Sequence, residues 1–424
     1  MTNDSIDMLG QSIDGPVVDW HPPVLTWVLG VSWDLTRSAV LLLLIQIAAV
    51  SWAIRRVLDL AIDLRAPVVA VYGFGVVVCA LPSVGVLTVS VWKDVLYAVG
   101  FLLVVEWVVR LAMWKLGPLA GPSDAASTSR LYCGLTVMLL LRVNGVVVVG
   151  LITVLLVPLV KGLHRQALTA LLGAGLTFAV ITMLLYPAFG VRGAGESTTA
   201  SLAVFDLSAV AQHAPGSLDD DVEAALESMI PMSEYRARFN CHWTGNRDFL
   251  ADTTPGGNTD VAALSRGWRE SLLRQPFLLA GNHLCAASEV WSPLPSPEEK
   301  ESFETVYDRI IPNDYGLRTA PISDRVSNRV RELLASVTQN DFAQVFLWRA
   351  ATWFWLLVVL LAAAALRWRS WWCLVPLIPA VCLGVSVVAI FGPHYRYGAP
   401  MWMVSVLLLP LGLQLLLGTR SSRA

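Results

Sequence analysis

Long apolar runs with few charged residues limit the folds that are open to this chain. They cover about 37–54, 67–91, 95–114, 167–188, 346–366, 371–391 and 400–418, and each is close to the roughly 20 residues that a helix needs to cross a bilayer. With 55% hydrophobic and 15% charged residues over a length of 424, the chain is too apolar for a soluble protein. The sequence therefore predicts an all-α polytopic membrane protein.

The apolar stretch 131–160 is too long for one span and too short for two. Arg142, Asn144 and Gly145 lie at its middle. An arginine at membrane depth is costly unless it faces protein or a wet cavity. We therefore predict two shortened helices that meet at a polar tip, which brings the total to about nine membrane segments. A single long, tilted helix is the alternative.

Basic residues predict how the chain is oriented in the membrane. Residues 1–36 contain several Asp and no Lys or Arg, whereas basic residues follow the first span. Because cytoplasmic loops are enriched in Lys and Arg, the N-terminal arm is expected on the outer side. The basic positions expected inside are Arg55, Lys115, Lys161, Arg367 and Arg420.

Four regions follow from this pattern. Residues 1–36 form an outer N-terminal arm and 37–189 an N-terminal membrane bundle. Residues 190–345 are rich in polar side chains and have helical periodicity, which predicts a mainly helical soluble domain on the outer side. Residues 346–424 contribute the C-terminal membrane helices. A formal net charge of -2 and no basic stripe give no indication of nucleic-acid binding, and the expected surroundings are the lipid bilayer of the cell membrane.

Acidic side chains and a histidine precede the first span. The segment 19–23 reads Asp-Trp-His-Pro-Pro, and its two prolines turn the chain towards the membrane. Asp19 is a candidate general base, and His21 a candidate phosphate-binding group. Asp4 and Asp7 belong to the same arm, and either could replace Asp19. A solvated polar arm without chemistry is the alternative.

Lys93 and Asp94 lie in a second outer loop, at the start of the next span. Asp94 could join the first carboxylate in one outward-facing site, while Lys93 neutralises an anionic leaving group. The alternative is structural, because an aspartate can cap a helix N-terminus and a lysine can extend its amine to the membrane surface.

Further polar residues are expected on the same face. Arg142 and Asn144 lie at the predicted tip, and His394, Arg396 and Tyr397 lie in the last outer loop. Intramembrane ionisable groups are functional candidates by default. For the last loop, an interfacial belt of aromatic and basic side chains is the alternative.

The order of these motifs resembles that of GT-C-type membrane glycosyltransferases, which use lipid-phosphate-linked sugars. In that family a span precedes the first outer loop, and here the chain begins within the loop. The resemblance covers most of the membrane part and rests on Asp4-Ser5, Gly15, the Asp-Trp-His-Pro-Pro segment, Lys93-Asp94, the Arg-Val-Asn-Gly at 142–145 and the His-Tyr-Arg-Tyr at 394–397.

The resemblance implies inverting transfer of a sugar from a polyprenyl-phosphate donor to a glycan, lipid or protein acceptor at the outer membrane face. A carboxylate would take the proton of the acceptor, and cations would hold the departing phosphate. No cofactor is predicted, and a divalent-cation requirement is left open. The catalytic candidates are Asp4, Asp19 and Asp94, and the substrate-binding candidates are Asp7, His21, Lys93, Arg142, Asn144, His394, Arg396 and Tyr397.

Two functions of other classes compete with this one. A transporter or lipid flippase also uses broken helices with polar tips at mid-membrane. A non-catalytic envelope assembly protein would use the soluble domain for docking. A transporter has no stated need for clustered outer-loop carboxylates, which favours the transferase over it.

Cys241 and Cys285 are the two cysteines of the predicted soluble domain. In an exported domain such a pair indicates a disulfide. The rival is a zinc site that also uses His242 and His283, although neighbouring residues such as Cys241 and His242 rarely both reach one tetrahedral metal. Unpaired thiols are the third possibility.

Overall fold

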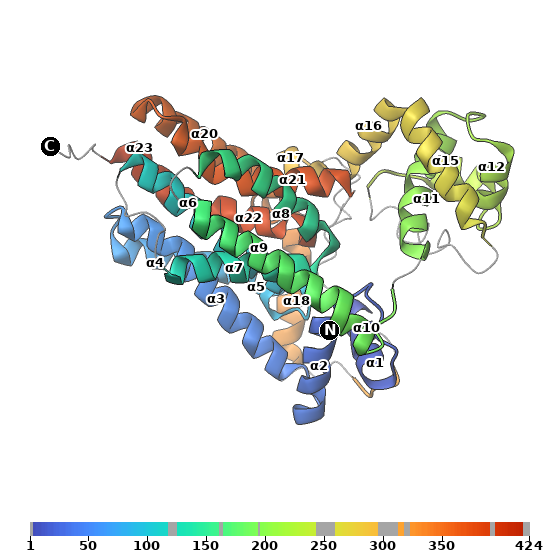
Figure 1. Ribbon diagram of the computed structural model, residues 1–424, viewed down its shortest axis with the longest axis horizontal. Helices are drawn as coiled ribbons and strands as arrows, with labels where there is room; N and C mark the ends of the chain where they lie inside the picture. The colour runs from blue at the N-terminus through green and yellow to red at the C-terminus, as the bar shows by residue number, and fades with distance from the viewer. Residues whose placement is uncertain are drawn as a thin grey trace.

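The computed structural model describes residues 3–117, 125–160, 164–193, 196–242, 259–295, 313–317, 323–390 and 395–418 (Figure 1). Within these ranges the regular structure is helical, and extended pairing is limited to one isolated bridge between Val18 and Arg192. The all-α prediction is confirmed for this part of the chain.

Six helical segments in the described ranges are long and apolar enough to cross a membrane. They are α3 (Val40–Asp63), α6 (Lys93–Leu116), α9 (His164–Val180) with η2 (Ile181–Leu185) and α10 (Tyr186–Ala188), α20 (Ala350–Trp368), η6 (Trp371–Leu377) with α21 (Ile378–Ala389), and α22 (Tyr395–Leu407) with α23 (Leu409–Leu417). These helices are compatible with a multi-pass membrane protein.

A seventh span is present only if a bent pair is counted as one. The helices α4 (Val68–Ala80) and α5 (Pro82–Val89) meet at an angle of 65°. Pro82 begins α5 and has no amide N–H to continue the hydrogen bonding of α4. Among the described residues the full-length spans therefore number six or seven, and the predicted nine are not confirmed.

The predicted break at Arg142 is present. The helix α7 (Ala125–Leu141) ends and α8 (Val143–Leu156) begins on either side of Arg142, whose backbone is extended. Both helices are shorter than a full span, and η1 (Val157–Leu159) follows α8. The turn is tight, because a Cβ on Gly145 would overlap the carbonyl oxygen of Met138.

The helix α6 is the centre of the bundle. Within the apolar 18-residue stretch of α6, 89% is buried inside the protein. The corresponding share is 33% for α3 and 11% for the segment that contains α9. It packs closely on α7, since a Cβ on Gly100 would meet the carbonyl oxygen of Gly134 at 2.8 Å, and one on Gly134 that of Gly100 at 2.7 Å. Small residues allow such close approach of helices in membranes.

A buried carboxylate holds three helices together. Glu106 of α6 accepts hydrogen bonds from Arg56 of α3 at 2.9 Å, from Arg110 at 2.6 Å and from Arg130 of α7 at 2.9 Å. Glu106 is fully buried, so these partners offset the cost of placing a charge inside the bundle.

A separate helical group lies at one end of the bundle, to the right in Figure 1. It contains α11 (Glu196–His213), α12 (Asp220–Glu227), α13 (Met232–Arg238), α15 (Val261–Arg274) and α16 (Pro276–Ala286). Its own hydrophobic core runs from Ala203 to Ala286, whereas Ala287 and Val290 pack in the core of the bundle. This second core is therefore narrower than the range 190–345 that the composition indicates.

Buried hydrogen bonds join this helical group internally. Asp206 of α11 is fully buried and accepts from Trp268 Nε1 of α15 at 2.8 Å and from Asn282 Nδ2 of α16 at 3.1 Å. The His283 Nε2 atom lies 2.9 Å from the same carboxylate. One carboxylate thus links three helices of the group.

The remaining helices either precede α3 in the chain or lie between the helical group and α20. They are α1 (Asn3–Asp14), α2 (Pro23–Thr36), α17 (Ser288–Trp291), α18 (Asp324–Gln339), α19 (Asp341–Ala343) and η5 (Gln344–Trp348). The N-terminal arm is thus largely helical, and Pro23 occupies the first turn of α2, where no amide donor is needed. Ser5 Oγ donates to the carbonyl of Val91 at 2.6 Å and attaches α1 to the start of α6.

Candidate functional site

Charged side chains gather where the first turns of α6, α8 and α22 meet. Arg142, which precedes α8, forms an ion pair with Asp94 in the first turn of α6. Its guanidinium also lies 4.1 Å from the ring centroid of Tyr397, in the first turn of α22. Helix N-termini carry partial positive charge, so this junction favours a negatively charged group.

Arg142 is held on several sides. Its Nε donates to Asn144 Oδ1 at 2.9 Å, and its guanidinium lies 5.7 Å from the centroid of Tyr97. The side chain is only 8% exposed. The extended backbone at the α7–α8 break directs Arg142 towards α6, which a continuous helix would not do.

Arg396 connects α22 to the N-terminal helix. Its Nη1 donates to Asp4 Oδ2 at 2.6 Å, and its Nε lies 4.0 Å from Asp94 Oδ2. Its Nη2 reaches the Tyr397 hydroxyl at 3.4 Å. Two arginines therefore approach the carboxylate of Asp94 from different helices.

Lys93 and His21 lie beside these groups. Lys93 Nζ is 5.9 Å from the ring centroid of Trp20, and its charge acts on Asp4 and on His21. His21 Nε2 is 2.9 Å from Asp7 Oδ2, which also accepts from Gln11. We call Asp4, Lys93, Asp94, Arg142, Arg396 and Tyr397 the charged cluster.

The surroundings of Asp4 and His21, at the edge of the charged cluster, shift the pKa values of both groups. Burial raises the pKa of Asp4, but the charges of Arg396 and Lys93 and the Arg396 hydrogen bond outweigh it, so the pKa is lowered and the carboxylate is ionised at neutral pH. Burial and the charge of Lys93 lower the pKa of His21, although Asp4 and Asp7 oppose them. Neutral His21 then donates from Nε2 to Asp7.

The buried polar atoms at the site that have no hydrogen-bond partner among the described residues include His21 Nδ1 and the Tyr97 hydroxyl. Buried polar groups are nearly always hydrogen-bonded, so such atoms beside the charged cluster are available to a bound molecule.

Not every predicted site residue joins the cluster. Asp19 is exposed, and its amide donates to the carbonyl of Arg192 at 3.0 Å. Its charge acts on Tyr186 of α10. Asp7 also lies outside the charged cluster, and its side chain is 57% exposed. His394 lies outside the described residues.

The alternative role for Asp94, capping the N-terminus of α6, is not present in the structure. Trp92 is the N-cap of α6, no side chain caps it, and Asp94 pairs with Arg142 instead. Sequence reasoning missed Tyr97, which follows Lys93 by one helical turn and therefore lies on the same side of α6.

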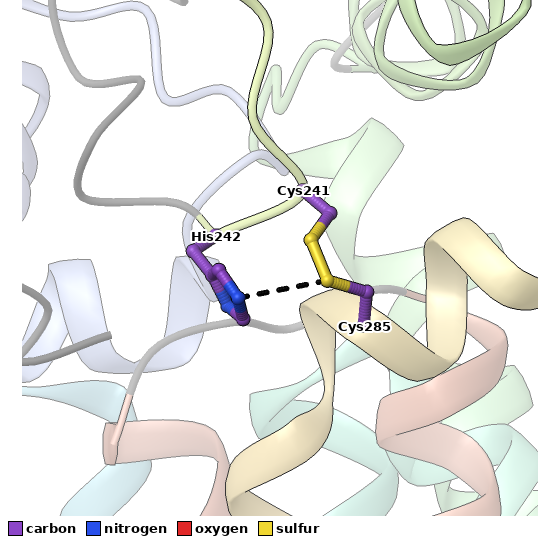
Figure 2. Close-up of side chains that lie close together, drawn as sticks. All are labelled: Cys241, His242 and Cys285. Carbon is purple, nitrogen blue, oxygen red and sulfur yellow. Dashed lines mark hydrogen bonds between the residues drawn. A yellow bond between two sulfur atoms is a disulfide. The ribbon is translucent and has the colours of Figure 1, made fainter. Parts of the chain in front are cut away.

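A disulfide joins Cys241 and Cys285 in the helical group (Figure 2), with Cα atoms 5.8 Å apart. His242 Nε2 lies 3.6 Å from Cys285 Sγ. These three residues are the one group of His, Cys and acidic side chains in the described ranges whose ligand atoms lie close enough to share a metal, and the cysteines could bind one only in the reduced form. His283 contacts Asp206 instead, so the four-ligand zinc arrangement is not formed.

Comparison of the chain with protein-family models, with curated proteins and with solved structures finds no match.

Proposed function

We propose that this protein is a membrane glycosyltransferase that moves a sugar from a polyprenyl-phosphate donor to an acceptor at the outer membrane face. The observation that carries the proposal is the charged cluster. This cluster contains two carboxylates and three cations, which come from α1, α6, the α7–α8 break and α22. They meet at the first turns of three helices. Long apolar helices, which a polyprenyl chain can lie against, are beside them.

The charges suit the leaving group of this reaction. The donor phosphodiester carries one negative charge, and the bond between the sugar C1 and a phosphate oxygen breaks with its electron pair left on that oxygen. The departing polyprenyl phosphate then carries a second negative charge. Arg142, Arg396 and Lys93 stabilise this developing charge, because fixed cations in a water-poor site act most strongly on charge that appears in the transition state.

Asp4 is the best-placed base. Its carboxylate is ionised, partly exposed and held by Arg396. As the acceptor hydroxyl oxygen attacks C1 from the face opposite the phosphate, its proton passes to Asp4, and the configuration at C1 inverts. Asp94 positions Arg142 through their ion pair. Asn144 fixes the guanidinium from the other side.

The test is sugar transfer by purified protein in lipid vesicles with a panel of polyprenyl-phosphate sugars. Asp4→Asn should lower the rate about 100-fold or more, the contribution typical of a general base. Asp19→Asn is the matched control, because Asp19 belongs to the same arm but is exposed, and it should leave the rate within about twofold. Absence of transfer with every donor overturns the function. Loss of transfer in Asp19→Asn alone overturns the choice of base.

A lipid transporter or flippase is the second candidate, and the break between α7 and α8 favours it. The same vesicles separate the two functions. Movement of a labelled polyprenyl-phosphate lipid between leaflets, without formation of a glycosylated product, supports the transporter.

A further inference from the structure

The exposed face of α16 is apolar. Phe277, Ala280, Gly281 and Leu284 are spaced three or four residues apart, so they share one side of the helix, and all four are exposed. Phe277 is 90% exposed. A water-facing helix normally presents polar side chains on this side.

Other helices of the same group present charge to the outside. Asp220 of α12 and both Arg266 and Arg269 of α15 are exposed. Between Pro276 and Trp291, in contrast, Glu289 is the one acidic or basic residue apart from His283, and it is buried. The uncharged exposed surface therefore lies mainly on α16 and its continuation, preceded by the exposed Leu272 and Leu273 at the end of α15.

This surface lies at the end of a candidate membrane span. His283 Nδ1 is 3.0 Å from the carbonyl oxygen of Val388, in the last turn of α21. Figure 1 shows α16 between the other helices of the helical group and the end of α21. A helix at the end of a span lies where the hydrocarbon gives way to lipid headgroups.

Two tryptophans join the surface to a second span. Trp355, near the N-terminus of α20, donates from Nε1 to the carbonyl of Trp291 at 2.8 Å. Trp291 in turn donates to the carbonyl of Leu284 at 2.7 Å. Both tryptophan rings are partly exposed. Val359, which lies one turn further along α20, is exposed as well. Tryptophan is enriched at membrane interfaces, where its ring is buried in lipid and its N–H is satisfied.

We propose that α16 is an interfacial helix, with Phe277 and Leu284 inserted among the lipids. The apolar side of a helix can lie among the lipid headgroups with its axis in the plane of the interface, and in α16 the opposite side is held by the protein. Its inner side holds Asp206 through Asn282 and His283, so lipid contact fixes the position of the whole helical group above the bundle.

Site-specific photo-crosslinking of the full-length protein in phospholipid vesicles tests this inference. A benzophenone amino acid replaces Phe277, and lipid adducts are measured by mass spectrometry after irradiation. Val359, exposed on α20, is the positive control, and the exposed Glu227 of α12 is the negative control. Phe277 should give adducts comparable with Val359 and about tenfold above Glu227.

Two results overturn the inference. One is a lipid-adduct yield at Phe277 no higher than at Glu227, whatever Val359 shows. The other is a crosslinked dimer as the main product at Phe277, which assigns this face to a second copy of the chain. Neither result bears on sugar transfer, so the proposed function is tested separately.

Discussion

Arg142 is the residue on which the charged cluster depends most, because it contacts α6, α8 and α22 from one backbone position. Its fork donates to Asn144 and forms the ion pair with Asp94. Its plane lies near the ring of Tyr397. A lysine carries the same charge but has one donor centre and no plane.

Arg142→Lys is therefore expected to lower kcat/KM for sugar transfer about 10- to 100-fold, equivalent to losing one or two charged hydrogen bonds. Arg55→Lys is the matched control, since Arg55 has a side chain 69% exposed and lies outside the cluster. Equal activity of the two variants in the vesicle assay would contradict the role of the guanidinium fork.

Gly145 permits the break that directs Arg142. A Cβ at this position would overlap the carbonyl of Met138, which is backbone and cannot rotate away. Gly145→Ala should lower the free energy of unfolding by about 1–3 kcal/mol. Gly150→Ala in the same helix has open space around its Cβ and should be neutral or stabilising by up to about 1 kcal/mol. Thermal unfolding in detergent measures both, and equal melting temperatures would refute the steric argument.

Among the helices, α16 carries one titratable ring, that of His283, with a hydrogen-bond acceptor beside each of its two nitrogens. The partners that face His283 are the carboxylate of Asp206 on α11 and the carbonyl of Val388 on α21. Both accept hydrogen bonds, so the doubly protonated ring fits best. Burial lowers the pKa of His283, but the hydrogen bond and the charge of Asp206, with the Val388 carbonyl, raise it overall.

The contribution of His283 to stability should decrease as the pH rises. A raised folded-state pKa gives stability that is fully present below the unfolded value of about 6.5 and is lost as pH rises through the folded value. The contact between α16 and α21 should therefore loosen with rising pH. The protection factors of the α16 amides, which correct for the intrinsic base catalysis of hydrogen exchange, should fall above this window in the native chain, and His283→Gln should remove this fall. An unchanged exchange profile in His283→Gln would contradict the link.

The elements were more predictable than the site. Apolar runs predict helices because membrane length and backbone hydrogen bonding leave few alternatives. The break at Arg142 was predictable from an arginine and a glycine inside such a run. The choice between Asp4 and Asp19 was not, because both carboxylates belong to the same acidic arm. It depends on Arg396, 392 positions away from Asp4, and on the formation of α1.

At the scale of the whole molecule, two of the basic residues that end membrane helices, Lys115 and Arg367, lie at the end of the bundle opposite the charged cluster. Arg367 donates to the carbonyl of Gly418 at 3.2 Å, and Gln414 donates to that of Leu64 at 3.0 Å, so the ends of α20, α23 and α3 coincide. Lys115, at the end of α6, lies 5.9 Å from the ring of Trp372, which follows α20. We propose that this end is cytoplasmic.

This orientation predicts that α12 is on the outer side. A cysteine at the exposed Asp220, in a chain whose exposed Cys79 and Cys133 are replaced by alanine, should react with an impermeant thiol reagent in intact cells. A cysteine at the exposed Arg369 should react only after permeabilisation. The reverse pattern would place the charged cluster on the cytoplasmic face.

We propose that the charged cluster binds the phosphate of a polyprenyl-phosphate lipid. A structure of the full chain determined with bound polyprenyl monophosphate tests this binding. Phosphate oxygens are expected within hydrogen-bond distance of both Arg142 and Arg396, with the prenyl chain along the apolar helices. A phosphate bound elsewhere, with the Arg142–Asp94 pair unchanged and no lipid beside it, would contradict the claim.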